Sequence, residues 1–341
     1  MEPLKIEDGA FGLACSCAMF WYFLQMYLSS SRRDRFLISG LALFWVLLLL
    51  SGCAPALAEP IPTVRLNELS PLPTVNAEVF PLRVAVAAMI SPQGTVASYQ
   101  PLLDYLSQRL GRPLQLVQRR TYAEVNELIQ HQEVDLAFIC TRAYVLGRRD
   151  FGLELLAIPQ VRSETVYYAK LIVRADVPAH TVADLRGTVF AFTDPLSTTG
   201  YLYPSVLVHR LGATPASFFR RTFFTYSHDK AIYAVAEGVA DAAAVDSLVL
   251  DFALARDPLL RERLRVIHTS PPFGMPPVVV GPEVRPQTKA LLRELLLGMK
   301  DDPQGRLALA ALGIEGFVPG RDTDYDSVRA LEAEVAKWEA R

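Results

Sequence analysis

The sequence is poor in the residues that build metal sites and disulfide frameworks, and it has no excess of either charge. Its 341 residues include four cysteines and five histidines, and no two pairs of cysteines have the spacing of a zinc site. The 34 basic residues stand against 36 acidic ones, which gives a formal net charge of −2. Without a basic excess, neither nucleic-acid binding nor a polybasic membrane arm is expected. We therefore predict no metal, no cofactor and no nucleic-acid partner.

The sequence also has no motif of a common catalytic class. It contains no nucleophile elbow, no Walker loop and no metalloprotease helix motif. Cys140 is the only cysteine beyond residue 53, so it has no disulfide partner in the body of the chain. A single cysteine of this kind is compatible with an oxidising compartment. A protein that is not an enzyme is predicted.

The N-terminal region has the three parts of a secretory signal peptide. A basic cluster at 32–35 precedes an apolar run at 36–50, and the run ends in Leu-Ser-Gly-Cys at 50–53. The last four residues resemble the bacterial lipobox, which implies that Cys53 carries a lipid and becomes the mature N-terminus. Fifteen apolar residues are short for a membrane span, which needs about 20. The alternative is a plain membrane anchor at 36–50.

The residues on either side of this signal are also interpretable. Residues 1–30 contain a second apolar stretch, which predicts translation from Met19 or Met26, with a genuine first membrane span as the alternative. Residues 54–81 contain six prolines and no sustained periodicity, as is typical of a semi-extended tether. Residues 1–53 are thus predicted to be leader and signal peptide, and the protein is predicted to be extracytoplasmic and anchored through Cys53.

From residue 82 the chain alternates between short β-rich runs and amphipathic helical stretches, which predicts α/β lobes with mostly parallel sheets flanked by helices. The expected strands are 82–88, 114–117, 134–139, 188–192, 221–226 and 241–246. The expected helices are 99–110, 122–130, 200–210, 229–237, 286–299, 303–312 and 325–339. One lobe is assigned to 82–172 plus 274–341 and the other to 173–273, with two hinge crossings between them.

The segment 193–204 has the character of an anion-binding loop. Ser197, Thr198 and Thr199 follow an expected strand and open an expected helix. Hydroxyls and free N–H groups at a helix N-terminus form an anion site. The following Gly200 lets the backbone approach a ligand closely. Simple capping by a hydroxyl is the alternative, but three hydroxyl residues in a row favour a ligand loop.

Further candidates lie where other expected strands end. His228 opens a helix and can donate to an anion, and Asp246 lies at the end of a buried strand, where open α/β folds bind ligands. Alternatively, both residues are simple capping residues. An ionised carboxylate accepts hydrogen bonds only, so it favours an anion that carries a hydroxyl proton. Thr141 and Tyr144, in an expected loop at 140–145, and the expected loop 88–95 are the candidates on the opposing lobe.

These segments resemble the phosphate/phosphite/phosphonate-binding proteins of ABC transporters, a branch of the type II periplasmic binding fold. The matching stretches are 91–116, 134–145, 194–204 and 227–249. The family's anion loop usually reads Ser-Thr-Ser-Gly, whereas Thr199 occupies the third position here. By this resemblance Ser197, Thr198, Thr199, His228 and Asp246 are ligand contacts, with Tyr144 as a further contact.

The resemblance implies a two-lobe, monomeric solute-binding lipoprotein that captures a small oxyanion and delivers it to an ABC permease. A phosphonate, phosphite or phosphate is the expected ligand. Two other functions stay open. The same module could report its ligand in trans to a membrane sensor kinase, or His228 and Asp246 could form an acid–base pair of an enzyme, although no nucleophile accompanies them.

Overall fold

The computed structural model describes residues 80–339, and the structural statements below concern this range. The predicted leader, the lipidation residue Cys53 and residues 54–79 of the predicted tether lie outside it. Among the described residues, no helix is both long and apolar enough to cross a membrane.

The first lobe is built on a six-stranded sheet in the order β13-β4-β12-β3-β1-β2. Strand β1 pairs in parallel with β2 and β3, whereas β12 is antiparallel to both β3 and β4. Strands β1 to β4 therefore run in one direction, and β12 and β13 run against them. The strands are β1 Leu82–Val86, β2 Leu114–Gln118, β3 Leu136–Phe138, β4 Glu154–Gln160, β12 Val278–Val280 and β13 Gly316–Val318.

The second lobe is built on a five-stranded sheet in the order β10-β6-β9-β7-β8. Strands β8, β7 and β9 are mutually parallel, while β6 is antiparallel to its neighbours β9 and β10. The strands are β6 Ala169–Arg174, β7 Val189–Phe192, β8 Arg221–Phe224, β9 Ala242–Asp246 and β10 Leu264–Thr269. Both sheets are flanked by helices, so the two-lobe α/β fold expected from the sequence is confirmed.

The helices fall into the same two groups. Those of the first lobe are α3 Pro92–Leu110, α4 Tyr122–Gln130, α5 Thr141–Phe151, α11 Pro286–Gly298 and α12 Pro303–Leu312. Those of the second are α6 Tyr203–Arg210, α7 Pro215–Phe218, α8 His228–Ala236, α9 Ser247–Arg256 and α10 Leu260–Arg263. Short turns occur at η2 Ala183–Leu185, η3 Thr198–Leu202, η4 Met299–Asp301 and η5 Asp322–Tyr325.

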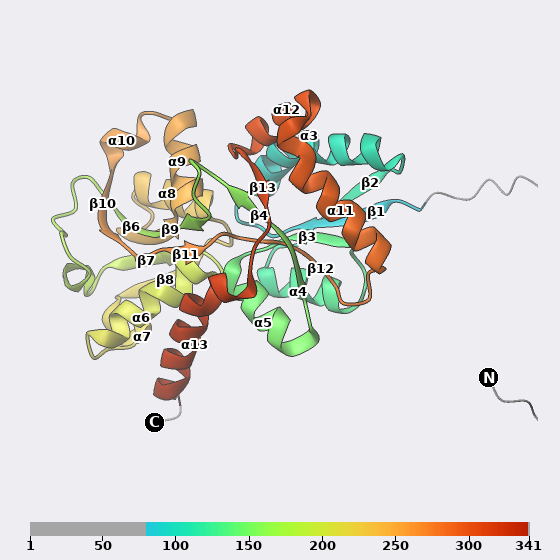
Figure 1. Ribbon diagram of the computed structural model, residues 1–341. Helices are drawn as coiled ribbons and strands as arrows, with labels where there is room; N and C mark the ends of the chain where they lie inside the picture. Colours follow the sequence, from blue (N-terminus) through green and yellow to red (C-terminus); the bar gives the residue numbers. More distant parts are fainter. Residues whose placement is uncertain (1–79, 340–341) are drawn as a thin grey trace, which may run out of the picture. The chain divides into compact units, whose positions relative to one another are not determined.

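Two chain crossings and the last helix connect the lobes. Strands β5 Val166–Tyr167 and β11 Phe273–Gly274 form a small antiparallel pair between the sheets. The last helix, α13 Asp326–Glu339, packs against α5 of the first lobe and α6 of the second (Figure 1). The lobes are therefore linked by two chain crossings and bridged at their surface by α13.

Two expected loops are wrong, and both contain helix starts. Within the expected loop 88–95, helix α3 already begins at Pro92, because proline is well suited to the first turn of a helix. Within 140–145, helix α5 begins at Thr141. Helix α5 has a low apolar content, with Arg148 and Arg149 in its last turn, so the sequence carries little helical periodicity here. The consequence is that both segments present helix N-termini rather than loops to the second lobe.

Candidate functional site

Six helix N-termini lie at the carboxyl ends of parallel strands among the described residues. In the first lobe β1, β2 and β3 lead to α3, α4 and α5, and in the second β7, β8 and β9 lead to η3, α8 and α9. Backbone N–H groups of a first helical turn lack intrahelical partners and carry the positive end of the helix dipole. This arrangement favours a negatively charged ligand between the lobes.

The hydroxyl triplet opens η3 and is completely buried. Ser197 is the N-cap, and its Oγ accepts a hydrogen bond from the Gly200 amide at 3.0 Å. The Thr198 and Thr199 side chains have no exposed surface, and Thr199 Oγ1 has no hydrogen-bond partner among the described residues. A Cβ atom at Gly200 would overlap the Thr193 side chain, so the turn requires glycine.

A chain of hydroxyl groups connects this turn to the first lobe. Thr198 Oγ1 lies 2.5 Å from Thr141 Oγ1, at the start of α5, and Thr141 Oγ1 lies 2.9 Å from the Tyr167 hydroxyl in the crossing strand β5. Thr141 and Tyr167 are also buried. The structure thus brings the predicted first-lobe residue Thr141 into direct contact with the predicted second-lobe loop.

His228 is a neutral hydrogen-bond donor in this setting. The backbone amide of Asp246 donates to its Nδ1 at 3.0 Å, so the proton of the neutral ring is on Nε2. Nε2 lies 3.5 Å from Ser197 Oγ, too far for a strong hydrogen bond. Burial lowers the pKa of the imidazole to about 3. The Nε2–H group is therefore able to donate to a ligand at neutral pH without bringing a charge.

Asp246 combines a capping role with an unusual pKa. Its Oδ1 accepts from the amides of Leu248 and Val249 in the first turn of α9, at 2.7 and 3.4 Å. Burial raises the pKa of this carboxyl to about 7, and these amide hydrogen bonds offset only part of the effect. Near neutral pH Asp246 can therefore be present with or without its proton. Asp246 is therefore the N-cap of α9, as the alternative interpretation predicted, and it is also a group able to share a proton with a ligand.

Five buried hydroxyl groups make no hydrogen bond among the described residues, namely those of Tyr122, Thr193, Thr199, Ser205 and Ser227. Those of Tyr122, Thr199 and Ser227 lie at or beside the helix N-termini described above. Burial is the main cause that raises the pKa of Tyr122, with negative charge at Cys140, Asp194 and Asp246 adding to it. A buried polar group without a partner is unfavourable unless a ligand or water satisfies it.

Three tyrosines lie in this region that the sequence patterns did not predict. Tyr122 opens α4 just after β2 ends, Tyr99 lies in the first half of α3, and Tyr167 lies in β5. Burial raises the pKa of the Tyr99 phenol, and the charge of Asp246 adds to this effect. The position of Tyr122 after an expected strand was the one available sequence signal.

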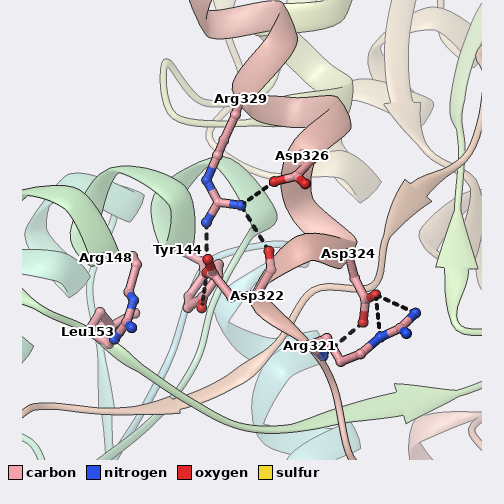
Figure 2. A network of polar contacts seen from close by, with 8 residues as sticks. All are labelled: Tyr144, Arg148, Leu153, Arg321, Asp322, Asp324, Asp326 and Arg329. Carbon is pink, nitrogen blue, oxygen red and sulfur yellow. Dashed lines mark hydrogen bonds and ion pairs between the residues drawn. The ribbon is translucent and has the colours of Figure 1, made fainter.

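Tyr144, in contrast, is not part of this group. Its hydroxyl donates to Asp322 Oδ1 at 2.7 Å, and its ring packs against Tyr325 with centroids 4.6 Å apart. Asp322 also accepts from Arg329 at 2.7 Å, and Arg329 pairs with Asp326 (Figure 2). Tyr144 is thus directed towards the C-terminal segment, and the structure does not bring it into contact with Thr141 and Thr198. That Tyr144 contacts the ligand stays a prediction.

Direct contacts hold the two lobes together around the site. The amide of His228 donates to the Met89 carbonyl at 2.9 Å, and the amide of Ser91 donates to the Asp229 carboxylate at 3.0 Å. The amide of Tyr122 donates to Asp194 at 3.1 Å.

Within residues 80–339, no group of His, Cys, Asp and Glu side chains has the arrangement of a metal site.

Comparison with known proteins gives consistent matches. The family described as ABC transporter, phosphonate, periplasmic substrate-binding protein matches residues 84–325. The Phosphate-import protein PhnD of Mycolicibacterium smegmatis is 28% identical over 279 residues, covering 75% of this chain and 87% of that protein. The Phosphonates-binding periplasmic protein of Escherichia coli is 25% identical over 263 residues, covering 73% and 75%.

A solved structure shares the fold. It is a binding-protein component of an ABC phosphonate transporter from Pseudomonas aeruginosa, which superposes with a TM-score of 0.70 at 24% identity. The match covers 74% of this chain and 85% of that chain.

Proposed function

The chain belongs to the phosphonate periplasmic substrate-binding proteins of ABC transporters, and from this membership we propose that it captures a small protonated oxyanion for import. A phosphonate, phosphite or phosphate is the proposed ligand class. The two curated relatives carry names that refer to phosphate in one case and phosphonates in the other, which supports this class. The family is one of substrate-binding proteins for transport, and we propose that this chain binds its ligand without converting it.

The observation that carries the proposal is the set of unpartnered hydroxyls between the lobes. Thr199, Ser227 and Tyr122 have buried hydroxyl groups that make no hydrogen bond among the described residues, and the Nε2–H group of His228 has only a long contact. These groups can all donate to phosphoryl oxygens. Together with Ser197, Thr198 and Thr141, they form the proposed oxyanion site.

Asp246 supports a ligand that carries a proton. An ionised Asp246 would accept a hydrogen bond from a ligand hydroxyl, and a protonated Asp246 would donate one to a ligand oxygen. In either case one proton lies between the carboxyl and the ligand, as a hydrogen phosphonate or hydrogen phosphate permits. A fully ionised sulfate has no proton to share, and an ionised Asp246 would repel it.

The contacts between the lobes suggest how binding leads to transport. Thr141 and Thr198 come from opposite lobes and lie within hydrogen-bond distance, so an anion bound to the helix N-termini would favour the closed arrangement. Closure of this kind is a common response of two-lobe binding proteins to their ligand. We propose that an ABC permease recognises the closed form and receives the anion from it.

The remaining expectations belong to the same proposal. We propose a monomeric lipoprotein with lipid on Cys53 and a tether over 54–81. The predicted lobe boundary at 172–173 falls inside β6, which belongs entirely to the second sheet, so we propose that the first boundary lies just before Ala169 and keep the second at 273–274. Mass spectrometry of the membrane-bound protein tests the anchor, because the mature N-terminal peptide must begin at a lipid-modified Cys53. An unmodified Cys53 inside a longer peptide would contradict it.

Calorimetry tests the ligand class and the site. The purified full-length protein is titrated at neutral pH with phosphite, phosphate, methylphosphonate and sulfate. We expect binding of the first three, and we expect Thr198→Ala and Asp246→Ala to weaken it at least tenfold, since loss of one charge-assisted contact is typically worth about 1.5–3 kcal/mol. Unchanged affinity in both variants would remove these residues from the site.

A further inference from the structure

Helix α13 is fixed at its start to the first lobe. The ring of Tyr325, directly before α13, packs on Tyr144, and its hydroxyl donates to the carbonyl of Met275 at 2.9 Å, beside the second chain crossing. Arg329, one turn into α13, donates to Asp322, which also accepts from Tyr144 (Figure 2). The first turns of α13 must therefore move together with the first lobe.

The second half of α13 contacts the second lobe instead. The carboxylate of Glu334 accepts two hydrogen bonds from the guanidinium of Arg210, the last residue of α6, at 2.9 and 2.8 Å. Trp338 stacks on the neighbouring His209, with ring centroids 4.4 Å apart. Two parallel hydrogen bonds fix the relative position of their groups better than a single one. One helix that starts on the first lobe thus holds the second lobe at its other end (Figure 1).

Arg142 connects α13 to the segment 193–197, which leads from β7 into the hydroxyl triplet. It is the second residue of α5, directly after Thr141. Its Nε donates to the carboxylate of Glu332 in α13, and its Nη1 donates to the carbonyl of Pro195 in the second lobe at 2.5 Å. The Arg142 side chain is only 14% exposed, so water competes weakly for these hydrogen bonds. Arg142 is thus a contact between the lobes whose direction is set by α13.

The contacts of α13 occur together with the closed arrangement of the site. The pair Arg142 and Pro195 lies next in sequence to the pair Thr141 and Thr198, which joins the lobes at the proposed oxyanion site. A movement that separates the two threonines must also carry Pro195 away from Arg142. Contacts that exist only in the closed form increase its population, and a ligand that needs this form then binds more tightly.

We propose that α13 is a latch, a segment whose contacts with both lobes stabilise the closed form, and that Arg142, oriented by Glu332, is a positioning residue that holds the segment 193–197 in place. Neither residue has to touch the ligand. Where it concerns affinity, this role rests on the proposed function. The pair of Arg210 and Glu334 has the smaller share, because exposed ion pairs contribute little and these side chains are 51% and 29% exposed.

Two backbone amides report the closed form without any ligand. The amide of Tyr122 donates to Asp194 and the amide of His228 donates to the carbonyl of Met89, in both cases across the lobes. Each opening of the lobes exposes these amides to water, so their hydrogen exchange measures how often the protein opens. The amides of β7 lie inside one sheet and report unfolding of the second lobe instead.

Hydrogen exchange of the ligand-free, full-length protein, followed by mass spectrometry, tests the latch directly. Arg142→Met should accelerate exchange of the two inter-lobe amides at least fivefold and leave the β7 amides unchanged. Arg149→Met is the matched control, because Arg149 is exposed on the same helix and pairs with its neighbour Asp150. It should change neither set. Unchanged exchange in Arg142→Met, or equal acceleration of both sets of amides, would overturn the latch.

Binding kinetics with methylphosphonate test Arg142 as a positioning residue. Because the ligand enters the open form, Arg142→Met should raise the dissociation rate about tenfold and change the association rate less than twofold. Arg142→Lys keeps the charge but lacks the planar fork that reaches Glu332 and Pro195 together, so it should behave like Arg142→Met. Wild-type kinetics of Arg142→Lys would show that only the charge matters and would overturn the positioning role.

Variants of α13 itself complete the test. Glu332→Ala should raise the dissociation rate about fivefold, whereas Glu332→Gln, whose side-chain oxygen still accepts from Arg142, should stay within twofold of the wild type. Arg210→Glu and Glu334→Arg should each raise it about threefold, and the double variant with both reversals should restore it. Failure of the double variant to restore the rate would remove this pair from the latch.

The two measurements separate failure of the latch from failure of the proposed function. If the wild type binds methylphosphonate and the Arg142 variants change neither hydrogen exchange nor kinetics, the latch is wrong and the oxyanion function stands. If the wild type binds no phosphoryl compound, the proposed function fails, while faster exchange of the inter-lobe amides in Arg142→Met would still support the latch.

Discussion

Two polar clusters on the same helix behave in opposite ways: the cluster around Thr141 is buried, whereas Asp322 and Arg329 of the cluster around Tyr144 are partly exposed. At the start of α5, Thr141 joins a group in which several hydroxyls have no partner and Asp246 has a pKa raised to about 7. One turn later, Tyr144 joins Asp322 and Arg329, and its hydroxyl and the guanidinium are hydrogen-bonded within the network (Figure 2). The unpartnered cluster has the features of a ligand site, whereas the paired cluster has those of a structural contact.

The two carboxylates show the difference most clearly. Burial would raise the pKa of Asp322, but hydrogen bonds from Tyr144 and Arg329 and the charge of Arg329 outweigh it, so this pKa lies below its usual value. Asp246 receives only backbone amide hydrogen bonds, and burial dominates. A carboxyl group without a cation nearby is available to a ligand proton, whereas one that is already paired with arginine is not.

The largest expected effect is the opposite pH dependence of the variants Asp246→Asn and Asp322→Asn. The folded-state pKa of Asp246 is about 7, above its unfolded value near 3.8, so its contribution to stability is lost as pH rises from about 4 through 7. Asparagine can keep the cap of α9 without this loss. The free energy of unfolding of Asp246→Asn should therefore exceed that of the wild type by about 4 kcal/mol at pH 8 and by little at pH 4.

Asp322→Asn should change stability in the other direction. Its lowered pKa contributes stability above the unfolded value, and this contribution is lost as pH falls below about 4. The variant should thus be less stable than the wild type at pH 8, with the difference shrinking in acid. Urea unfolding of ligand-free protein at both pH values measures these differences. If both variants changed stability in the same direction at pH 8, the proposed difference between the two carboxyl groups, one with a raised and one with a lowered pKa, would be wrong.

The next effect concerns the backbone beneath the hydroxyl triplet. Gly200→Ala should destabilise the protein by about 1–3 kcal/mol, because the new methyl group overlaps the Thr193 side chain, and should weaken methylphosphonate binding at least tenfold. Gly298→Ala is the matched control at the end of α11, where a Cβ atom meets nothing within 4 Å. It should leave binding unchanged. Thermal unfolding and calorimetry measure both variants, and normal binding by Gly200→Ala would separate η3 from the ligand.

The difference between the clusters also explains what the sequence could and could not predict. The triplet at 197–199, His228 and Asp246 lie close together in the structure, as predicted from their positions after expected strands, because strand ends are determined by local pattern. The contact of Tyr144 with Asp322 could not be predicted, because Asp322 lies far along the chain. The positions of Tyr99 and Tyr167 could not be predicted for the same reason, since only tertiary packing brings their segments together.

A smaller effect is expected on the choice of anion. Asp246→Asn replaces a group that shares a proton by an amide that can donate to a fully ionised oxygen. We expect this variant to bind sulfate about tenfold more tightly and methylphosphonate about tenfold more weakly than the wild type, which corresponds to about 1.4 kcal/mol in each direction. Asp176→Asn, which changes an exposed carboxylate paired with Arg174 at the end of β6 and outside the proposed site, is the control. Parallel changes for both anions would show that Asp246 does not select protonated ligands.

The smallest effect is expected from Tyr144→Phe. The variant removes one hydrogen bond to Asp322 but keeps the packing on Tyr325, so stability should fall by about 1 kcal/mol. Affinity for methylphosphonate should change less than twofold, because the lost hydroxyl is directed away from the oxyanion site. Thr198→Val, which also removes one buried hydroxyl, should instead weaken binding at least tenfold with a similar change in stability. If Tyr144→Phe weakened binding as strongly as Thr198→Val, the Tyr144 hydroxyl would belong to the ligand site. The distinction between the paired and the unpaired cluster would then be wrong.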